Sequence, residues 1–271
     1  MIPPEHAQQA MQAMQAMQWC GRLIAVAIVF QTIELLQLRR LTRNDGIWAW
    51  DAIKCDYEGF PRPVSTMLAW VLHWRVYAHL LRLRLLFALV ALWSPHPWLW
   101  WLLFCFCLLA SMRWRGTFNG GSDRMTLVVL ASTCLASSFP DRPLVVLGSV
   151  LHIAVQAMLS YFVAGVGKFG SANWRTGRAL PRFLRADGYD PPRAARHLLR
   201  GRSRAWIASW CIIFFECGSP LALAGPRCCL LFIGFAGLFH LVIFCVFGLN
   251  RFVFAWAATY PALYFASTFS L

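Results

Sequence analysis

Apolar residues fall into eight runs along the chain, separated by short polar or basic segments. A helix that crosses a lipid bilayer needs about 17–25 mostly apolar residues. The pattern therefore predicts an all-α bundle of eight membrane-spanning helices, at residues 19–38, 79–93, 97–112, 124–139, 143–166, 205–224, 228–247 and 252–269. Several runs are short for a full crossing, which leaves seven spans and one re-entrant segment as an alternative.

The first 18 residues are expected to form a polar tail, followed by a single transmembrane domain over residues 19–271. The tail contains a Met-Gln-Ala repeat and has no lysine or arginine. A secretory signal peptide carries a basic leader before its apolar stretch. The first span is therefore expected to be a retained anchor.

The composition agrees with a membrane bundle. Of the 271 residues, 59% are hydrophobic and 13% are charged, whereas a soluble domain has about 45–50% and about 25%. This excludes a disordered chain, a collagen-like fibre and an ordinary soluble enzyme. The ten cysteines lie mostly in or beside apolar runs without the spacing of metal ligands. They are expected to pack as small hydrophobic residues, and no metal site is predicted.

The charge distribution predicts an orientation in the bilayer. Lysine and arginine total 25 against 11 acidic residues, and with eight spans the basic segments 39–63, 113–123 and 168–204 share one side. Loops rich in arginine and lysine remain in the cytoplasm, so both termini are expected outside, in a bacterial inner membrane. High basicity also occurs in nucleic-acid-binding proteins. In a chain this apolar, the expected partner of the basic loops is anionic lipid, and no nucleic acid is expected.

Residues 175–204 are too basic to cross the membrane. We expect an amphipathic segment on the cytoplasmic face, and a solvated connector is the alternative. Prolines at three positions divide it into short pieces. Its apolar positions are Leu180, Phe183, Leu184, Tyr189, Leu198 and Leu199.

Lys168 closes the fifth predicted span and is the first candidate for chemistry. Ionisable groups at membrane depth are costly and commonly functional. Desolvation disfavours the ammonium form of a lysine, which is how a lysine becomes a general base near neutral pH. The alternative is an anchor whose ammonium group reaches the interface. Gly165 and Gly167 remove side chains beside Lys168 and are expected to let a neighbouring helix or ligand approach.

His152, Gln156 and Ser160 precede Lys168 at intervals of four residues and therefore share one helix face. Such a polar ridge either hydrogen-bonds a neighbouring helix or forms the wall of a buried cavity leading toward Lys168. The second interpretation makes these three residues candidate cofactor-binding positions.

Glu216 and His240 are further candidates inside predicted spans. Pro220 is expected to kink the helix near Glu216. A carboxylate at this depth needs a partner, and the candidates are Lys168, Arg175 and His240. His240 is either a packing residue or an acid/base partner. Glu34, in the first span, is expected to pair with Arg82 or Arg84.

The turn before the fourth span contains Asn119, Gly120 and Gly121. Two glycines followed by serine and aspartate predict a tight turn and a helix N-cap. Consecutive glycines also leave backbone N–H groups open to an anionic or carbonyl ligand. Both roles stay open from the sequence.

At these positions the chain resembles the vitamin K-dependent γ-carboxylase-like membrane proteins, often called HTTM-domain proteins. The resemblance covers roughly residues 113–261 in four blocks that occur in the family's order. The matching positions are Ala164–Phe169 with Trp174 and Gly177, Asn119–Asp123, Phe215–Glu216, and Phe239–His240 with Gly248–Phe252.

The resemblance implies a quinol as cofactor. In the carboxylase, the lysine that matches Lys168 takes a proton from vitamin K hydroquinone, and oxygenation then yields a strong base that acts on glutamate. The resemblance extends a catalytic role to Glu216 and His240 at the level of their blocks, and a cofactor-binding role to Trp174.

Two functions follow from this. The first is a quinol-dependent membrane oxygenase or carboxylase that acts on a small or peptide substrate. The second is a non-enzymatic membrane accessory factor for the maturation, export or immunity of a small secreted peptide, because bacterial relatives include a maturation factor for a secreted toxin peptide.

Overall fold

Helices make up all the regular structure that the computed structural model describes, which covers residues 4–115, 120–186 and 190–268. The predicted all-α class is confirmed for these residues. Four described segments are long and apolar enough to cross a membrane: residues Gln8–Thr42, which contain most of α1 (Pro4–Gln37), together with α4 (Trp74–Trp93), α7 (Pro143–Gly170) and α12 (Pro226–Phe247).

The other four predicted spans correspond to shorter or interrupted helices. They are α5 (Pro97–Arg113), α6 (Gly120–Ser138), α11 (Arg202–Cys217) and the pair α13 (Asn250–Ala257) and α14 (Tyr260–Thr268). Proline explains two of the interruptions, because its ring lacks the N–H that continues a helix. Pro220 follows the end of α11 and lies in the first turn of the 3₁₀ helix η3 (Ser219–Ala224) instead of kinking one long helix. Pro261 lies in the first turn of α14.

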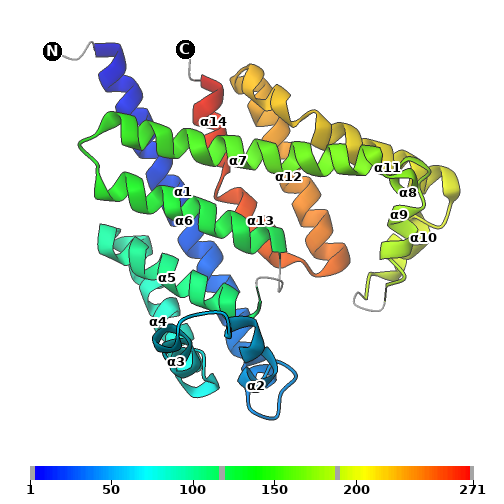
Figure 1. Cartoon of the computed structure of the whole chain (residues 1–271). Coiled ribbons are helices and arrows are strands. Elements are labelled where there is room, and N and C mark those ends of the chain that lie inside the picture. The colour runs from blue at the N-terminus through cyan, green and yellow to red at the C-terminus, as the bar shows by residue number, and fades with distance from the viewer. Residues whose placement is uncertain (1–3, 116–119, 187–189, 269–271) are drawn as a thin grey trace.

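Helix α1 lies at the centre of the bundle and contacts α4, α6, α7, α13 and α14 (Figure 1). It begins at Pro4, so the boundary expected at residue 19 falls inside the helix. Ala13 and Met17 are buried, as are Cys20 and Ala25 further along. Small side chains allow helices to pack closely where lipid supplies no hydrophobic driving force.

Short helices occupy the basic connections. The first connection holds η1 (Leu38–Thr42), α2 (Trp50–Ile53), η2 (Lys54–Tyr57) and α3 (Arg62–Val71), and the last holds α8 (Ala172–Arg175), α9 (Ala179–Phe183) and α10 (Arg193–Leu198). Figure 1 shows both termini at the top of the bundle, α2 at its lower end and α8–α10 at its right-hand end. The termini therefore lie away from both of these regions.

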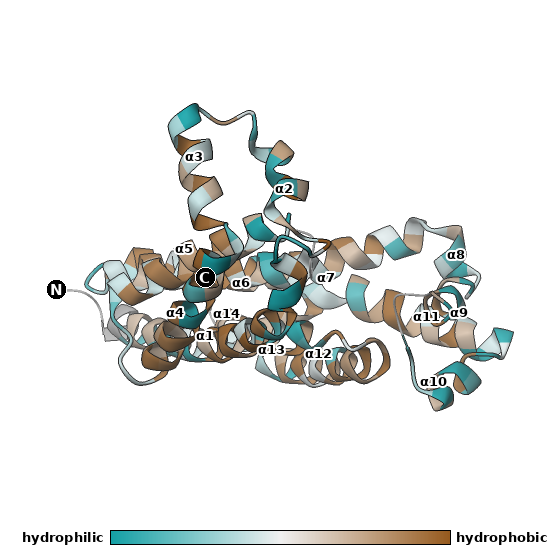
Figure 2. Cartoon of the chain, turned by 90° about the horizontal axis from the view of Figure 1, so that it is seen from below, coloured by the Kyte–Doolittle hydropathy of each residue, from teal (hydrophilic) through white to brown (hydrophobic). Residues whose placement is uncertain are grey.

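Apolar side chains cover much of the outer surface. Large residues on α12 such as Leu231, Phe235 and Leu238 are more than half exposed. In Figure 2 the ribbon of α12 has mainly the colour of hydrophobic residues, whereas that of α10 is largely hydrophilic. An exposed apolar surface of this kind fits contact with lipid chains.

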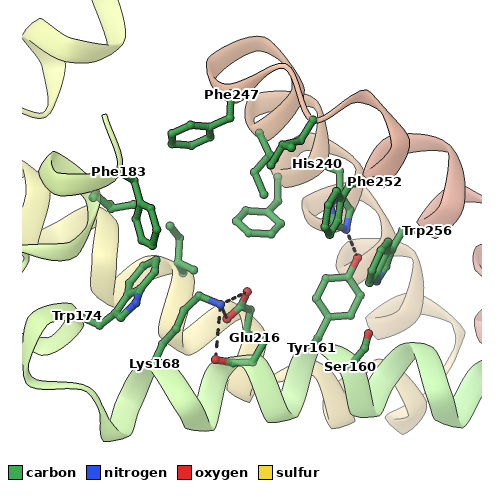
Figure 3. A pocket seen from close by; sticks show the side chains of 16 residues that line it. Ser160, Tyr161, Lys168, Trp174, Phe183, Glu216, His240, Phe247, Phe252 and Trp256 are labelled. Atoms are coloured by element: carbon green, nitrogen blue, oxygen red, sulfur yellow. Dashed lines mark hydrogen bonds and ion pairs between the residues drawn. The ribbon is translucent and has the colours of Figure 1, made fainter. Parts of the chain in front are cut away.

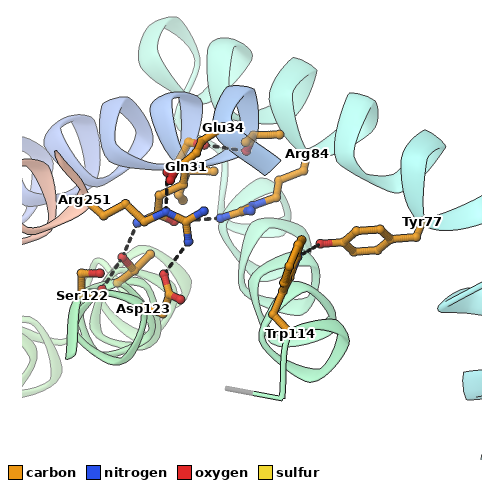
Figure 4. A network of polar contacts seen from close by, with 11 residues as sticks. Gln31, Glu34, Tyr77, Arg84, Trp114, Ser122, Asp123 and Arg251 are labelled. Carbon is orange, nitrogen blue, oxygen red and sulfur yellow. Dashed lines mark hydrogen bonds and ion pairs between the residues drawn. The ribbon is translucent and has the colours of Figure 1, made fainter. Parts of the chain in front are cut away.

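A largely buried polar network joins four helices near the C-terminal end of α1 (Figure 4). Arg251 from α13 donates to Glu34 of α1 at 2.7 Å and to Asp123 of α6 at 3.1 Å. Arg84 from α4 donates to Gln31 at 2.9 Å. The expected pairing of Glu34 with Arg82 or Arg84 is therefore wrong, because Arg251, which is distant in sequence, reaches Glu34 from the C-terminal part of the chain.

Candidate functional site

A cavity of about 320 Å³ lies between α7, α11, α12 and α13, at the end of the bundle where α8 and α9 fold back (Figure 3). Its walls are mainly apolar, and their aromatic members include Phe239, Phe247, Phe252 and Trp256. Ligand pockets in proteins are typically apolar with a few convergent polar groups, and their volumes start at about 300 Å³. This cavity also contains all three of the predicted catalytic residues, Lys168, Glu216 and His240.

Lys168 and Glu216 form an ion pair at one end of the cavity. The Lys168 Nζ atom lies 2.8 Å from Oε1 and 2.6 Å from Oε2 of Glu216. The Glu216 side chain is 4% exposed and that of Lys168 is 20% exposed. Of the three partners expected for Glu216, the structure selects Lys168. A carboxylate with both oxygens on one ammonium group forms a charge-assisted pair that can share a proton.

Close packing of α7 against α11 brings the two charges together. A Cβ atom on Gly165 would lie 2.6 Å from the backbone nitrogen of Cys217, a separation that real Cβ atoms do not show. Glycine is therefore needed where α7 passes the residue after Glu216. A Cβ atom on Gly167 would meet nothing within 4 Å. The expected close approach is confirmed at Gly165 and is absent at Gly167.

Gly177 makes a second close contact with α11. Its φ is +72°, in the region that glycine adopts readily, and a Cβ atom there would lie 2.6 Å from the backbone of Trp206. Trp210 of α11 donates its indole N–H to the Arg175 carbonyl at 3.2 Å. The chain after Lys168 is thus folded back onto the helix that carries Glu216.

This return of the chain closes the cavity beside Lys168. The Lys168 ammonium group lies 5.2 Å from the centre of the Trp174 ring, and Trp174 packs against Phe183. Leu180 is buried and also lines the cavity. Part of the segment predicted to be amphipathic therefore forms a wall of the site. The apolar positions Leu180 and Phe183 were visible in the sequence, but the surface they cover was not.

A second polar pair lies at the other end of the cavity. The Tyr161 hydroxyl is 2.7 Å from Nε2 of His240, and both residues are 3% exposed. The second ring nitrogen of His240, Nδ1, is buried without a hydrogen-bond partner among the described residues. Sequence reasoning did not assign Tyr161 a role. Its signal was its position seven residues before Lys168, which places both on one face of α7.

Of the three positions of the predicted polar ridge, the structure places one at the cavity and two away from it. Ser160 lines the cavity, but His152 is exposed on α7 and its Nδ1 lies 2.9 Å from the Ser132 hydroxyl of α6. Gln156 is not among the cavity residues. The three residues therefore do not form one continuous wall. Positions four residues apart are offset slightly around the helix axis, so that His152 lies against α6 whereas Ser160 lies at the cavity.

The glycine turn lies outside the cavity. Gly120 and Gly121 begin α6. Gly121 packs near the rings of Phe252 and Trp256, two residues that line the cavity, but does not itself line it. Asn119 lies outside the described residues. Within the described ranges, no three His, Cys, Asp or Glu side chains come together as metal ligands.

Comparisons with known proteins add no relative: no family model, no curated protein and no solved structure matches this chain.

Proposed function

We propose that this chain is a membrane enzyme of the vitamin K-dependent γ-carboxylase-like family, and that it takes a proton from a quinol bound in the cavity. The observation that carries the proposal is the Lys168–Glu216 ion pair, which is held in an aromatic cavity by the glycine and tryptophan residues that carry the family resemblance. The family assignment rests on those motifs.

The ion pair is suited to accept a proton from a hydroxyl group. The proton of the Lys168 ammonium group passes to Glu216 along the 2.6 Å hydrogen bond, which leaves the neutral Lys168 amine as the acceptor. Accepting the proton of the substrate changes the net charge of the pair from zero to +1. That charge then stabilises the oxyanion left on the substrate, and the apolar walls of the cavity strengthen this attraction.

The second pair is placed to bind the opposite end of the same ligand. Tyr161 and Lys168 are seven residues apart on α7, which separates their backbones by about 10 Å. This spacing leaves room for one aromatic ring system with a hydrogen bond at each end. His240 Nδ1 is an unsatisfied buried polar atom in this wall, and such atoms are rare unless a ligand or water completes them.

A quinol fits the lining of the cavity. Its ring would stack among Phe239, Phe252 and Trp174, while its hydroxyl groups would meet Lys168–Glu216 and Tyr161–His240. When bound, a quinol supplies a base on reaction with oxygen that is strong enough to remove a carbon-bound proton. The chain's own residues bind the ring, exclude water with aromatic side chains and accept the first proton.

The proposal includes eight crossings with both termini outside a bacterial inner membrane. In Figure 1 the connections that hold α2 and α8–α10 both lie away from the two termini, and positively charged loops stay in the cytoplasm. In this arrangement α5, α6 and α11 cross as short or tilted helices, while α13 and α14 cross together as a broken helix. Lys168 then lies near the cytoplasmic end of α7.

Ligand-dependent thermal stabilisation tests the proposed quinone site. The purified protein would be melted in detergent with and without added phylloquinone, because a ligand that binds only the folded state raises the melting temperature. Ala164→Phe places a ring inside the cavity, and Val155→Phe adds the same bulk on the exposed face of α7. We expect stabilisation in the wild type and in Val155→Phe, and none in Ala164→Phe.

Two results would contradict the proposal. One is the same stabilisation in both phenylalanine variants, which would place the ligand elsewhere. The other is no stabilisation of the wild type by phylloquinone at saturating concentration, which is the result expected of a non-enzymatic accessory factor.

A further inference from the structure

A second cavity, of about 280 Å³, lies at the opposite end of the bundle from Lys168. It is formed by the first half of α1, the turn between α4 and α5, and the end of α6. Pro95 and Pro97 belong to one bordering turn and Pro140 to the other. Because turns between membrane helices lie near the lipid headgroups, this cavity lies at the headgroup level of the side that carries the termini.

Arg22 supplies a positive charge to this cavity. It is the only lysine or arginine in the first 38 residues, and its guanidinium lies 5.4 Å from the centre of the Trp19 ring. No ion pair to Arg22 is found within the described residues, and no carboxylate lines the cavity. A cation at a membrane interface without an acidic neighbour is complementary to an anionic headgroup.

The polar lining is suited to bind an acceptor. The hydroxyl groups of Thr133 and Ser137 already donate to carbonyls of their own helix, at 2.8 Å and 3.1 Å. Arg22 and Gln18, which make no side-chain hydrogen bond within the described part of the chain, have N–H groups that can donate to a ligand. Phosphate oxygens accept such hydrogen bonds well, and arginine matches them in a bidentate manner.

The rest of the lining is apolar. Met14, Met17 and Trp100 form walls beside the polar end. Gly21 packs tightly there, since a Cβ atom would lie 3.2 Å from the Trp100 ring and 3.3 Å from Thr133. The cavity thus combines one cationic end with a surface for hydrocarbon, which is the chemistry of an amphiphile and not that of a free anion.

We propose that this cavity binds one anionic phospholipid, with its phosphodiester on Arg22 and Gln18 and the start of an acyl chain against Met14, Met17 and Trp100. The site is separate from the quinol cavity, and it does not depend on any chemistry at Lys168. It requires that α1 and the helices joined by the two bordering turns cross the membrane, and of these α1, α4 and α7 are long and apolar enough to do so.

The test measures lipid binding to the delipidated full-length protein in detergent. Phosphatidylglycerol, phosphatidylcholine and inorganic phosphate would be added separately, and native mass spectrometry and melting temperature would report binding. Arg22→Gln removes the charge in the cavity. Arg142→Gln removes an exposed charge from the α6–α7 connection on the same side and serves as the matched control. Arg22→Lys keeps the charge without the bidentate geometry.

We expect one tightly held phosphatidylglycerol per chain and no comparable effect of inorganic phosphate. Arg22→Gln should weaken phosphatidylglycerol binding about tenfold or more, because a hydrogen bond to a charged group is lost. Arg142→Gln should leave it unchanged, and Arg22→Lys should fall between these variants. Equal binding of the two phospholipids, equal effects of Arg22→Gln and Arg142→Gln, or stabilisation by inorganic phosphate alone would overturn the proposal. A destabilised Arg22→Gln would still be scored by the ratio of the two bound lipids in mass spectrometry.

Discussion

At the scale of single residues, the partner of the Glu216 carboxylate determines what chemistry the cavity can support. Three partners were compatible with its position in the sequence, and the structure places Lys168 on both of its oxygens. The sequence showed that a partner was needed, since an isolated charge at membrane depth is costly. It did not show which one, because helix rotation and the α7–α11 separation are tertiary properties.

Glu216→Gln should lower the melting temperature in detergent, because it leaves the Lys168 ammonium group beside a neutral amide in a largely apolar cavity. Breaking one partner of a buried pair costs about 3–5 kcal/mol. The double variant Glu216→Gln/Lys168→Met removes both charges and should recover part of this loss. The exposed pair of Arg196 and Asp190 is the control, since Asp190→Asn should cost at most about 1 kcal/mol. A double variant that is as unstable as the sum of both single variants would show that the pair is not coupled.

At the scale of helices, the contact between α7 and α11 positions the site. The motif that carries the family resemblance also explains the packing, because Gly165 and Gly177 both face the backbone of α11. The sequence predicted a close approach at this motif but gave no means of distinguishing Gly165 from Gly167. The two glycines differ in the direction of their Cα atoms: Gly165 faces the backbone of α11, and Gly167 faces open space.

Gly165→Ala and Gly167→Ala form a matched pair that tests this contact. Alanine at residue 165 forces α7 away from the Cys217 backbone, and overpacking of this kind costs about 1–3 kcal/mol. Alanine at residue 167 meets open space and should be neutral or stabilising by up to about 1 kcal/mol, because glycine weakens a helix interior. Melting temperatures in detergent provide the comparison. Equal effects of the two substitutions would contradict the proposed contact.

A second tertiary feature links helices that are far apart in sequence. Arg251 of α13 holds Glu34 and Asp123, and its side chain is 3% exposed. Arg251→Gln leaves two carboxylates without their cation and should destabilise the bundle by about 3–5 kcal/mol. Arg82→Gln, at an exposed position on α4, should have little effect. The difference in melting temperature measures this, and an Arg251→Gln variant as stable as Arg82→Gln would refute the structural role of the network.

At the scale of the whole molecule, the fold class could be predicted from the sequence, whereas the exact helices and the cavity could not. Apolar runs and net charge indicated a helical membrane bundle, because they depend on composition and length alone. The division of the last span into α13 and α14 was not foreseen, although Pro261 was visible within it. The cavity was not predictable as a volume, since its walls come from α7, α11, α12, α13 and the returning α8–α9 segment.

The proposed orientation predicts which side of the membrane exposes each connection. In a chain whose exposed native cysteines have been replaced by serine, a cysteine at Arg196 should react with a membrane-impermeant maleimide only after the cells are opened. A cysteine at Asp141, in the connection on the opposite side, should react in intact cells. The reverse pattern would invert the topology, and labelling of both positions in intact cells would exclude the eight-span arrangement.

The most direct test of the central claim compares Lys168→Arg with Lys168→Ala in an assay of oxygen-dependent vitamin K hydroquinone epoxidation. An anchoring role needs only a long cation, so arginine would replace lysine without loss. A proton-accepting role cannot be filled by arginine, which keeps its proton at every working pH. The account predicts that both variants, at wild-type expression and membrane level, lose about 10²–10⁴-fold in rate. Full activity of the Lys168→Arg variant would contradict it.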